Sequence, residues 1–133
     1  MNATSLTADA SGYPPSLREG LGEGPAPVLA ALGDLGLLRY PLLGLFCSVR
    51  CPGDVILRTY DLVRLIRKAG IAVIGGFHSP MEKECLALLL RGSQPLVVCP
   101  ARCIEGMRLP LAWRGPLAEE SKGGRVCFSK HMF

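Results

Sequence analysis

The sequence predicts an α/β domain built on an open parallel sheet, with helices on both faces. Three apolar segments of strand length, at residues 41–47, 71–75 and 95–99, alternate with two helical segments. Strands that alternate with helices in this way are typical of parallel sheets joined by right-handed crossovers. We therefore expect a Rossmann-like sheet, preceded by a short helical segment.

Composition and charge fit a single folded domain. The chain has 133 residues, of which 49% are apolar and 20% charged, so it can bury a real core and is not disordered. Residues 1–34 carry four acids and one arginine, whereas residues 35–133 carry fourteen Lys/Arg against seven acids. A basic body suits a phosphate-bearing partner, although many ordinary proteins share this balance.

The sequence predicts neither a membrane segment nor a secretory leader. The most apolar run, residues 35–49, is interrupted by Arg39 and Pro41 and is too short to span a bilayer. Residues 1–12 lack the basic and apolar regions of a signal peptide. We expect a cytoplasmic protein without a membrane partner.

The chain divides into three parts by pattern. Residues 1–12 are small and polar and predict a disordered lead-in, and residues 13–40 predict a short helical cap. Residues 41–133 form the sheet domain, in which 41–47 is the first buried strand. In the cap, apolar residues recur four positions apart: Leu17 with Leu21, and Val28 with Leu32.

The first long helix is expected after Pro52 and Gly53, running to about Ala69, with Gly70 as the residue that ends it. One face of this helix is apolar and the other basic. The apolar face holds Ile56, Tyr60, Val63 and Ile66, and the face left for water holds Arg58, Arg64, Arg67 and Lys68.

Right-handed crossovers place the ends of the three strands on one edge of the sheet, and we look for function there. Ser48 and Arg50 follow the first strand, and Arg102 stands in the matching place after the third. A hydroxyl and guanidinium groups at these positions suit phosphate binding, because Arg can hold two oxygens at once. The alternative is that these residues belong to solvated loops.

The second strand leads into a glycine turn and a helix start. Gly75 and Gly76 break the strand, Ser79 is placed to cap the helix, and Glu82 three residues later completes a capping box. Such a turn can form a phosphate cradle at a helix N-terminus, or it can be an ordinary turn and cap. His78 lies in the turn and is either exposed to ligand or incidental.

Six cysteines lie in apolar segments, and we expect reduced thiols rather than disulfides. Two pairs have C-x3-C spacing, Cys47 with Cys51 and Cys99 with Cys103, but structural zinc sites more often use closer pairs. Buried packing explains them equally well, so we expect no metal. No Ser-His-Asp or Cys-His arrangement is identifiable, and we predict no catalytic residue.

These segments, taken in order, resemble the DNA-processing protein A (DprA, or Smf) family of Rossmann-like proteins. The family's opening Tyr-Pro…Leu segment and Gly-x-x-x-Leu-Leu run correspond to Tyr13-Pro14…Leu17 and Gly33–Leu38. Its Gly-Ser-Arg strand end corresponds to Cys47-Ser48-Val49-Arg50, with one extra residue. Its Ser-Gly-x-x-x-Gly-Ile-Asp-x-x-Ala-His signature corresponds to residues 75–86, where Glu82 replaces the Asp and Leu86 the His.

The resemblance implies a protein that binds single-stranded DNA and helps to load a RecA-type recombinase in natural transformation, without a known catalytic step or cofactor. It also implies a homodimer as one option. The candidate phosphate-binding or nucleic-acid-binding residues are Ser48, Arg50, Gly75, Gly76, His78, Ser79, Glu82 and Arg102. Phe77 is the nearest aromatic residue for stacking on a base, and few other aromatics are available.

Two alternatives stay open at this stage. The turn also fits the spacing Gly-Gly-x-Gly-Thr-x-x-Glu of LOG-type nucleotide phosphoribohydrolases, in which Glu82 would assist cleavage of an N-glycosidic bond. The other alternative is a module that senses a small nucleotide.

The end of the chain differs from the rest. A short helix is expected around residues 105–108, and residues 117–133 offer one more strand, at 125–129, which would lie at an edge of the sheet. We expect the chain to be part of a larger domain.

Overall fold

A computed structural model describes residues 4–20, 24, 26–101 and 125–130 of the chain. It contains one mixed six-stranded sheet with the strand order β1-β2-β6-β5-β4-β3. The strands are β1 (Thr4–Leu6), β2 (Leu29–Leu32), β3 (Leu43–Gly44), β4 (Val73–Gly75), β5 (Leu96–Val98) and β6 (Arg125–Lys130). The helices are α1 (Pro15–Gly20), the 3-10 helix η1 (Leu35–Arg39), α2 (Gly53–Ala69) and α3 (Pro80–Leu89).

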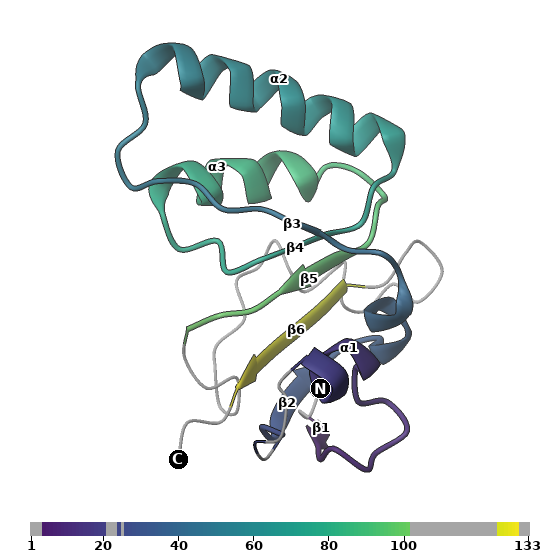
Figure 1. The fold of residues 1–133 in the computed structure, drawn as a ribbon. Helices are drawn as coiled ribbons and strands as arrows, with labels where there is room; N and C mark the ends of the chain where they lie inside the picture. The colour runs from purple at the N-terminus through teal and green to yellow at the C-terminus, as the bar shows by residue number, and fades with distance from the viewer. Residues whose placement is uncertain (1–3, 21–23, 25, 102–124, 131–133) are drawn as a thin grey trace.

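The three predicted strands β3, β4 and β5 are parallel neighbours, which confirms the Rossmann-like sheet. In the register of these strands, Val73 lies between Leu43 and Leu96. Figure 1 shows α2 and α3 stacked at the β3–β4 side of the sheet, whereas α1 lies with β1 and β2 at the other side.

Helical segments cover both faces of the parallel strands, as predicted. Alternate residues of a strand point to opposite faces, and here they enter two different apolar clusters. On one face Val73, Leu96 and Val98 pack with the inner side chains of α2 and α3. On the other face Val97 packs with Leu37 of η1.

The N-terminal segment is only partly helical, which corrects two expectations. Residues 4–6, expected to be disordered, form β1, and residues 29–32, expected to lie in a helical turn, form β2. β2 pairs antiparallel with β1 on one side and with β6 on the other, so its backbone is satisfied along both edges. Four buried residues form the core of this part: Leu6, Tyr13, Leu29 and Ala31.

The first predicted strand is neither as long nor as buried as expected. Only Leu43 and Gly44 form β3, and both are exposed at the edge of the sheet. Hydrogen bonds to β4 continue one residue further, from Leu45 N to Ile74 O at 3.0 Å. In the described part of the chain no strand pairs with the outer side of β3.

Helix α2 follows the predicted pattern closely. Val63 and Ile66 are buried, and Ile56 and Tyr60 are half-buried against the same cluster. Gly70 ends the helix in the left-handed conformation, with φ +72°. The basic face needs one correction, because Arg67 is half-buried and donates from Nη1 to the Leu88 carbonyl at 3.2 Å.

The predicted last strand is confirmed, but it does not lie at an edge. β6 is inserted between β5, to which it is parallel, and β2, to which it is antiparallel. The helix expected around residues 105–108 lies outside the described residues. None of the described helices has the length and apolar character needed to cross a membrane.

Candidate functional site

The carboxyl ends of β3, β4 and β5 meet at one edge of the sheet. Leu45 N donates to Ile74 O at 3.0 Å, and Cys99 N donates to Gly75 O at 2.9 Å, so the three chain segments leave the sheet side by side. The turns that follow β3 and β4 carry most of the predicted site residues. Arg102, predicted to join them from β5, lies outside the described residues.

Ser48 and Arg50 lie in the loop that connects β3 to α2, and both side chains are exposed. The Ser48 carbonyl accepts a hydrogen bond from Cys51 Sγ at 3.3 Å, which fixes the loop. Within the described part of the chain, the Arg50 guanidinium makes neither an ion pair nor a hydrogen bond. It is therefore available to a ligand at the carboxyl edge of the sheet.

Ser79 and Glu82 form the predicted capping box at the start of α3. Glu82 N donates to Ser79 Oγ at 3.3 Å, Ser79 N donates to Glu82 Oε2 at 3.3 Å, and Ser79 Oγ donates to the same Oε2 at 2.5 Å. Both side chains are buried, 7% and 8% exposed. Each residue thus has a structural partner, and the Glu82 carboxylate already occupies the anion position at this helix N-terminus.

The two glycines of the turn make room for protein atoms. A Cβ on Gly75 would meet the Leu45 carbonyl oxygen at 3.1 Å and the Phe77 ring at 3.2 Å. A Cβ on Gly76 would lie 2.7 Å from the exposed His78 ring. The close packing of protein atoms around Gly75 and Gly76 is therefore enough to account for a glycine at each position. That these glycines let the backbone approach a ligand stays a prediction.

Phe77 is not available for stacking, which corrects that expectation. Its backbone is left-handed, with φ +53°, and its ring is 5% exposed inside the cluster that joins α2 and α3 to the sheet. The turn thus buries Phe77 and leaves the neighbouring His78 on the surface. The Phe77 ring is therefore closed to a ligand at this edge.

Arg50 borders a hollow of about 420 Å³ between its loop, α2 and the first turn of α3. The other lining residues are Val49, Cys51, Ile56, Tyr60, Pro80, Met81 and Glu84. Arg50 was predicted as a site residue, whereas Tyr60 was predicted only as a packing residue of α2. One feature of the sequence could have indicated this hollow. Tyr60 follows the Arg50 loop by about two helical turns, so its side chain can lie near that loop.

A hydrogen bond between Tyr60 and Glu84 links α2 to α3. Tyr60 Oη donates to Glu84 Oε2 at 3.3 Å, and the Arg64 guanidinium lies over the Tyr60 ring at 5.8 Å. Burial and the Glu84 carboxylate raise the pKa of the Tyr60 phenol above its ordinary value. The phenol therefore remains a neutral donor, and Glu84 contributes a negative charge to the hollow.

Cys47, Cys51, Cys85 and Cys99 are free thiols. Burial raises the pKa of Cys85 to about 12 and that of Cys99 to about 11. Among the described residues, no three potential ligands lie close enough together to hold a metal ion. These thiols act in the structure as small apolar groups.

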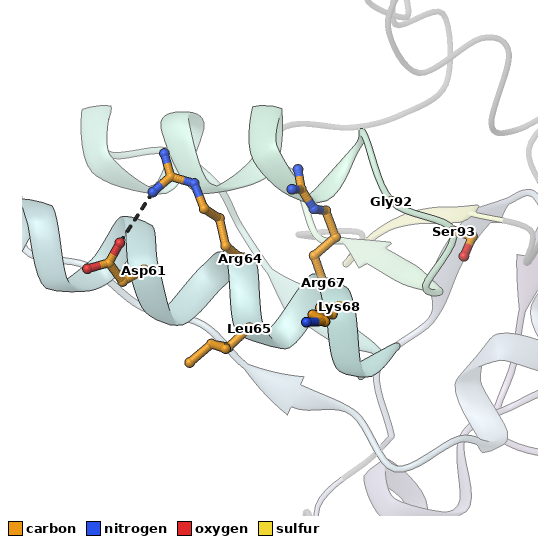
Figure 2. Close-up of a pocket in the computed structure, with 7 residues that line it drawn as sticks. All are labelled: Asp61, Arg64, Leu65, Arg67, Lys68, Gly92 and Ser93. Carbon is orange, nitrogen blue, oxygen red and sulfur yellow. Dashed lines mark hydrogen bonds and ion pairs between the residues drawn. The ribbon is translucent and has the colours of Figure 1, made fainter.

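A second hollow, of about 620 Å³, lies at the other end of α2 and is basic (Figure 2). It is lined by Asp61, Arg64, Leu65, Arg67, Lys68, Gly92 and Ser93. Arg64 pairs with Asp61 at 3.3 Å, and Arg67 is held by the Leu88 carbonyl. Lys68 is exposed and makes no ion pair in the described part of the chain. It therefore has the same charge and a similar exposure to Arg50, but it lies in the other hollow.

The fold defines an open α/β protein of the Rossmann-like class, with candidate ligand groups at the carboxyl edge of its parallel strands. Comparison with solved structures narrows this class to a DprA-like fold. The chain is similar to DNA processing protein A (DprA) from Streptococcus pneumoniae, with a TM-score of 0.68 and 16% sequence identity over 96% of this chain and 43% of that one.

DNA processing protein A from Helicobacter pylori is also similar, with a TM-score of 0.62 and 15% identity over 98% of this chain and 56% of that one. That structure is described in terms of the protein's unique mode of binding single-stranded DNA. The chain thus spans about half the length of these two proteins. No family model and no curated protein sequence matches it.

Proposed function

We propose that the chain binds single-stranded DNA at the carboxyl edge of its parallel strands, with Arg50 as the main phosphate contact. The observation that carries this proposal is the exposed Arg50 guanidinium, which has no partner in the described part of the chain, at the edge where open α/β sheets bind their ligands. The likeness to the H. pylori protein supports the choice of ligand, and the basic charge of residues 35–133 is consistent with it.

Arg50 is a better phosphate contact than the N-terminus of α3. The Glu82 carboxylate accepts hydrogen bonds from both Ser79 donors, so a phosphate there would meet an existing negative charge. The Arg50 guanidinium makes no ion pair in the described part of the chain, so it can hold two phosphate oxygens at once. Ser48 and His78, both exposed, are the residues that we expect to assist Arg50.

The proposed role follows that of the DprA family. The chain would protect single strands and help to load a RecA-type recombinase during natural transformation, in the cytoplasm and without a catalytic step. A homodimer is a further element of this proposal. The alternative nucleotide hydrolase has no supporting observation, because Glu82 is buried and bonded to Ser79 rather than presented to a ligand.

Fluorescence anisotropy with a labelled oligothymidine tests the DNA-binding proposal. We expect binding that weakens as salt is raised, because neutralised phosphates release counterions. Arg50→Ala should cost about 1–3 kcal/mol of binding free energy, the scale of a charged hydrogen bond. It should also reduce the salt slope by roughly one unit.

Lys68→Ala is the matched control, since it removes the same charge from the distant hollow. A general charge effect would weaken binding equally in both variants, whereas a phosphate contact at Arg50 would spare Lys68→Ala. Urea unfolding of both variants first shows that they are folded. Equal loss in the two variants, or no binding of the parent chain at low salt, would refute the proposal.

A further inference from the structure

The exposed apolar side chains of this protein gather on one part of the fold. In the described part of the chain, the large apolar residues that are exposed all lie between Tyr40 and Ile71, in β3, α2 and the segments beside them. Single exposed apolar residues are normal, whereas a gathering of them marks a surface that binds a partner. Because β3 is the last strand in the sheet order, this surface includes one edge of the sheet.

Three of these residues form an apolar stripe on α2. Val55, Leu62 and Leu65 are 42%, 54% and 64% exposed. Their spacing of seven and three positions places them on one side of the helix, as is found where two helices pack together. Figure 2 shows the Leu65 side chain pointing away from α3, so this side of α2 faces away from its neighbour helix. Arg58 stands within the stripe, and its aliphatic stem extends the apolar surface.

The charges of α2 favour an antiparallel copy of the same helix as the partner. Its first turn is acidic, with Asp54, and its last turn is basic, with Arg67 and Lys68. Asp54 and Lys68 are exposed, and neither makes an ion pair in the described part of the chain. Fourteen positions separate them, about 21 Å along a helix, so they cannot pair within one copy. Across a two-fold axis each would face the opposite charge of the second copy, and this pairing would occur twice in a dimer.

We propose that two copies of this chain pack through the apolar stripe, with their α2 helices antiparallel about a two-fold axis. In this arrangement Leu65 of one copy lies against Val55 of the other, and Leu62 against the stem of Arg58. The inference rests on the homodimer that the proposed function includes, and it gives that homodimer a surface. It needs neither Arg50 nor a bound strand.

Sedimentation velocity of the chain without DNA measures this association. The parent chain should show a monomer–dimer equilibrium that depends on protein concentration and stops at the dimer. Leu65→Asp should weaken the dimer by about 30-fold or more, the scale of losing a central contact of an interface. Leu57→Asp is the matched control and should leave the dimer unchanged. Leu57 is 67% exposed and, like Leu65, stands four positions from Asp61, but it lies on a different side of α2.

Charge reversal tests the antiparallel arrangement. Asp54→Lys and Lys68→Glu should each weaken the dimer about 2- to 30-fold, the effect of losing two exposed ion pairs. The double variant Asp54→Lys/Lys68→Glu should regain most of the affinity, because the two charges meet only between copies. Circular dichroism first shows that every variant is folded. If the double variant does not recover, the antiparallel arrangement is wrong.

Three other results would overturn the proposal. They are a chain that stays monomeric, association that continues beyond the dimer, and a dimer that Leu65→Asp and Leu57→Asp affect alike. A monomer would mean that the stripe binds a different protein. Because no DNA is present, failure here leaves the anisotropy test of Arg50→Ala standing, and failure of DNA binding leaves the dimer test standing.

Discussion

Removing the capping box of α3 tests the structural role that the fold assigns to Ser79 and Glu82. Ser79→Ala removes the oxygen that accepts from Glu82 N and the hydroxyl that donates to Glu82 Oε2. Loss of an N-cap costs about 0.5–2 kcal/mol. Glu82 is only 8% exposed, so its carboxylate, left with one fewer donor, adds to this cost on the scale of about 1–3 kcal/mol.

Glu82→Ala should lower the free energy of unfolding by about 0.5–2 kcal/mol, because it removes the other half of the same motif. Urea unfolding followed by circular dichroism gives both values, with a constant slope showing that the unfolded state is unchanged. Lys83→Ala is the control. It removes an exposed charged side chain from the same helix and should change stability by less than about 0.5 kcal/mol.

The double variant decides whether Ser79 and Glu82 act as a pair. Because each is the other's partner, the loss in Ser79→Ala/Glu82→Ala should be smaller than the sum of the two single losses. Additive losses would show that the two side chains do not interact. Losses no larger than that of Lys83→Ala would show that the motif does not stabilise α3, and the reasoning on the helix N-terminus would be wrong.

Two further predictions concern the turn and the thiols. Gly75→Ala should destabilise the fold by about 1–3 kcal/mol, because its Cβ would meet a backbone oxygen and a buried ring. Gly76→Ala should cost less than about 1 kcal/mol, since the exposed histidine ring that its Cβ would meet can move. The urea midpoints of the two variants test this difference. Cys85 and Cys99, whose pKa values burial raises, should react with iodoacetamide at pH 8 far more slowly than Cys51. Equal rates measured by mass spectrometry would contradict the raised pKa values. Because the Cys85 pKa is raised from 9.0 to about 12 in the folded chain, its contribution to stability is complete below pH 9 and is lost as pH rises towards 12.

The elements that the sequence predicted well are those specified by neighbouring residues. The end of α2 at Gly70 and the Ser79–Glu82 capping box depend on groups within four positions of each other, and both form as expected. The parallel order of β3, β4 and β5 also follows, because each crossover contains a single helix of clear pattern, α2 or α3.

The elements that it missed depend on distant pairing. The segment Leu29–Leu32 has the composition of a helix, but partners in β1 and β6 make it a strand. The length of β3 is limited because only β4 pairs with it in the described chain. No pattern near Arg125 shows that β6 enters the middle of the sheet rather than its edge.

The candidate site shows the same division. The place of Arg50 at the carboxyl edge could be predicted from its position after a strand, because the ends of parallel strands lie at one edge of the sheet whatever their side chains are. The burial of Phe77 could not be predicted, since it follows from a left-handed backbone at one residue and from helices that close over it. The sequence did not predict that Tyr60 lines a hollow. Its spacing on α2 shows which face of the helix it lies on, but not whether other residues cover that face near Tyr60.

The electrostatics of the carboxyl edge explain why binding should depend so strongly on one residue. A helix N-terminus normally favours an anion, but Glu82 supplies that anion from within the chain and is held there by Ser79. A second acid, Glu84, lines the neighbouring hollow. Under the proposed function, a phosphate is therefore attracted by Arg50 and repelled by the two acids of α3. This contrast is the reason for expecting the phosphate contact on the loop after β3 and not at the N-terminus of α3.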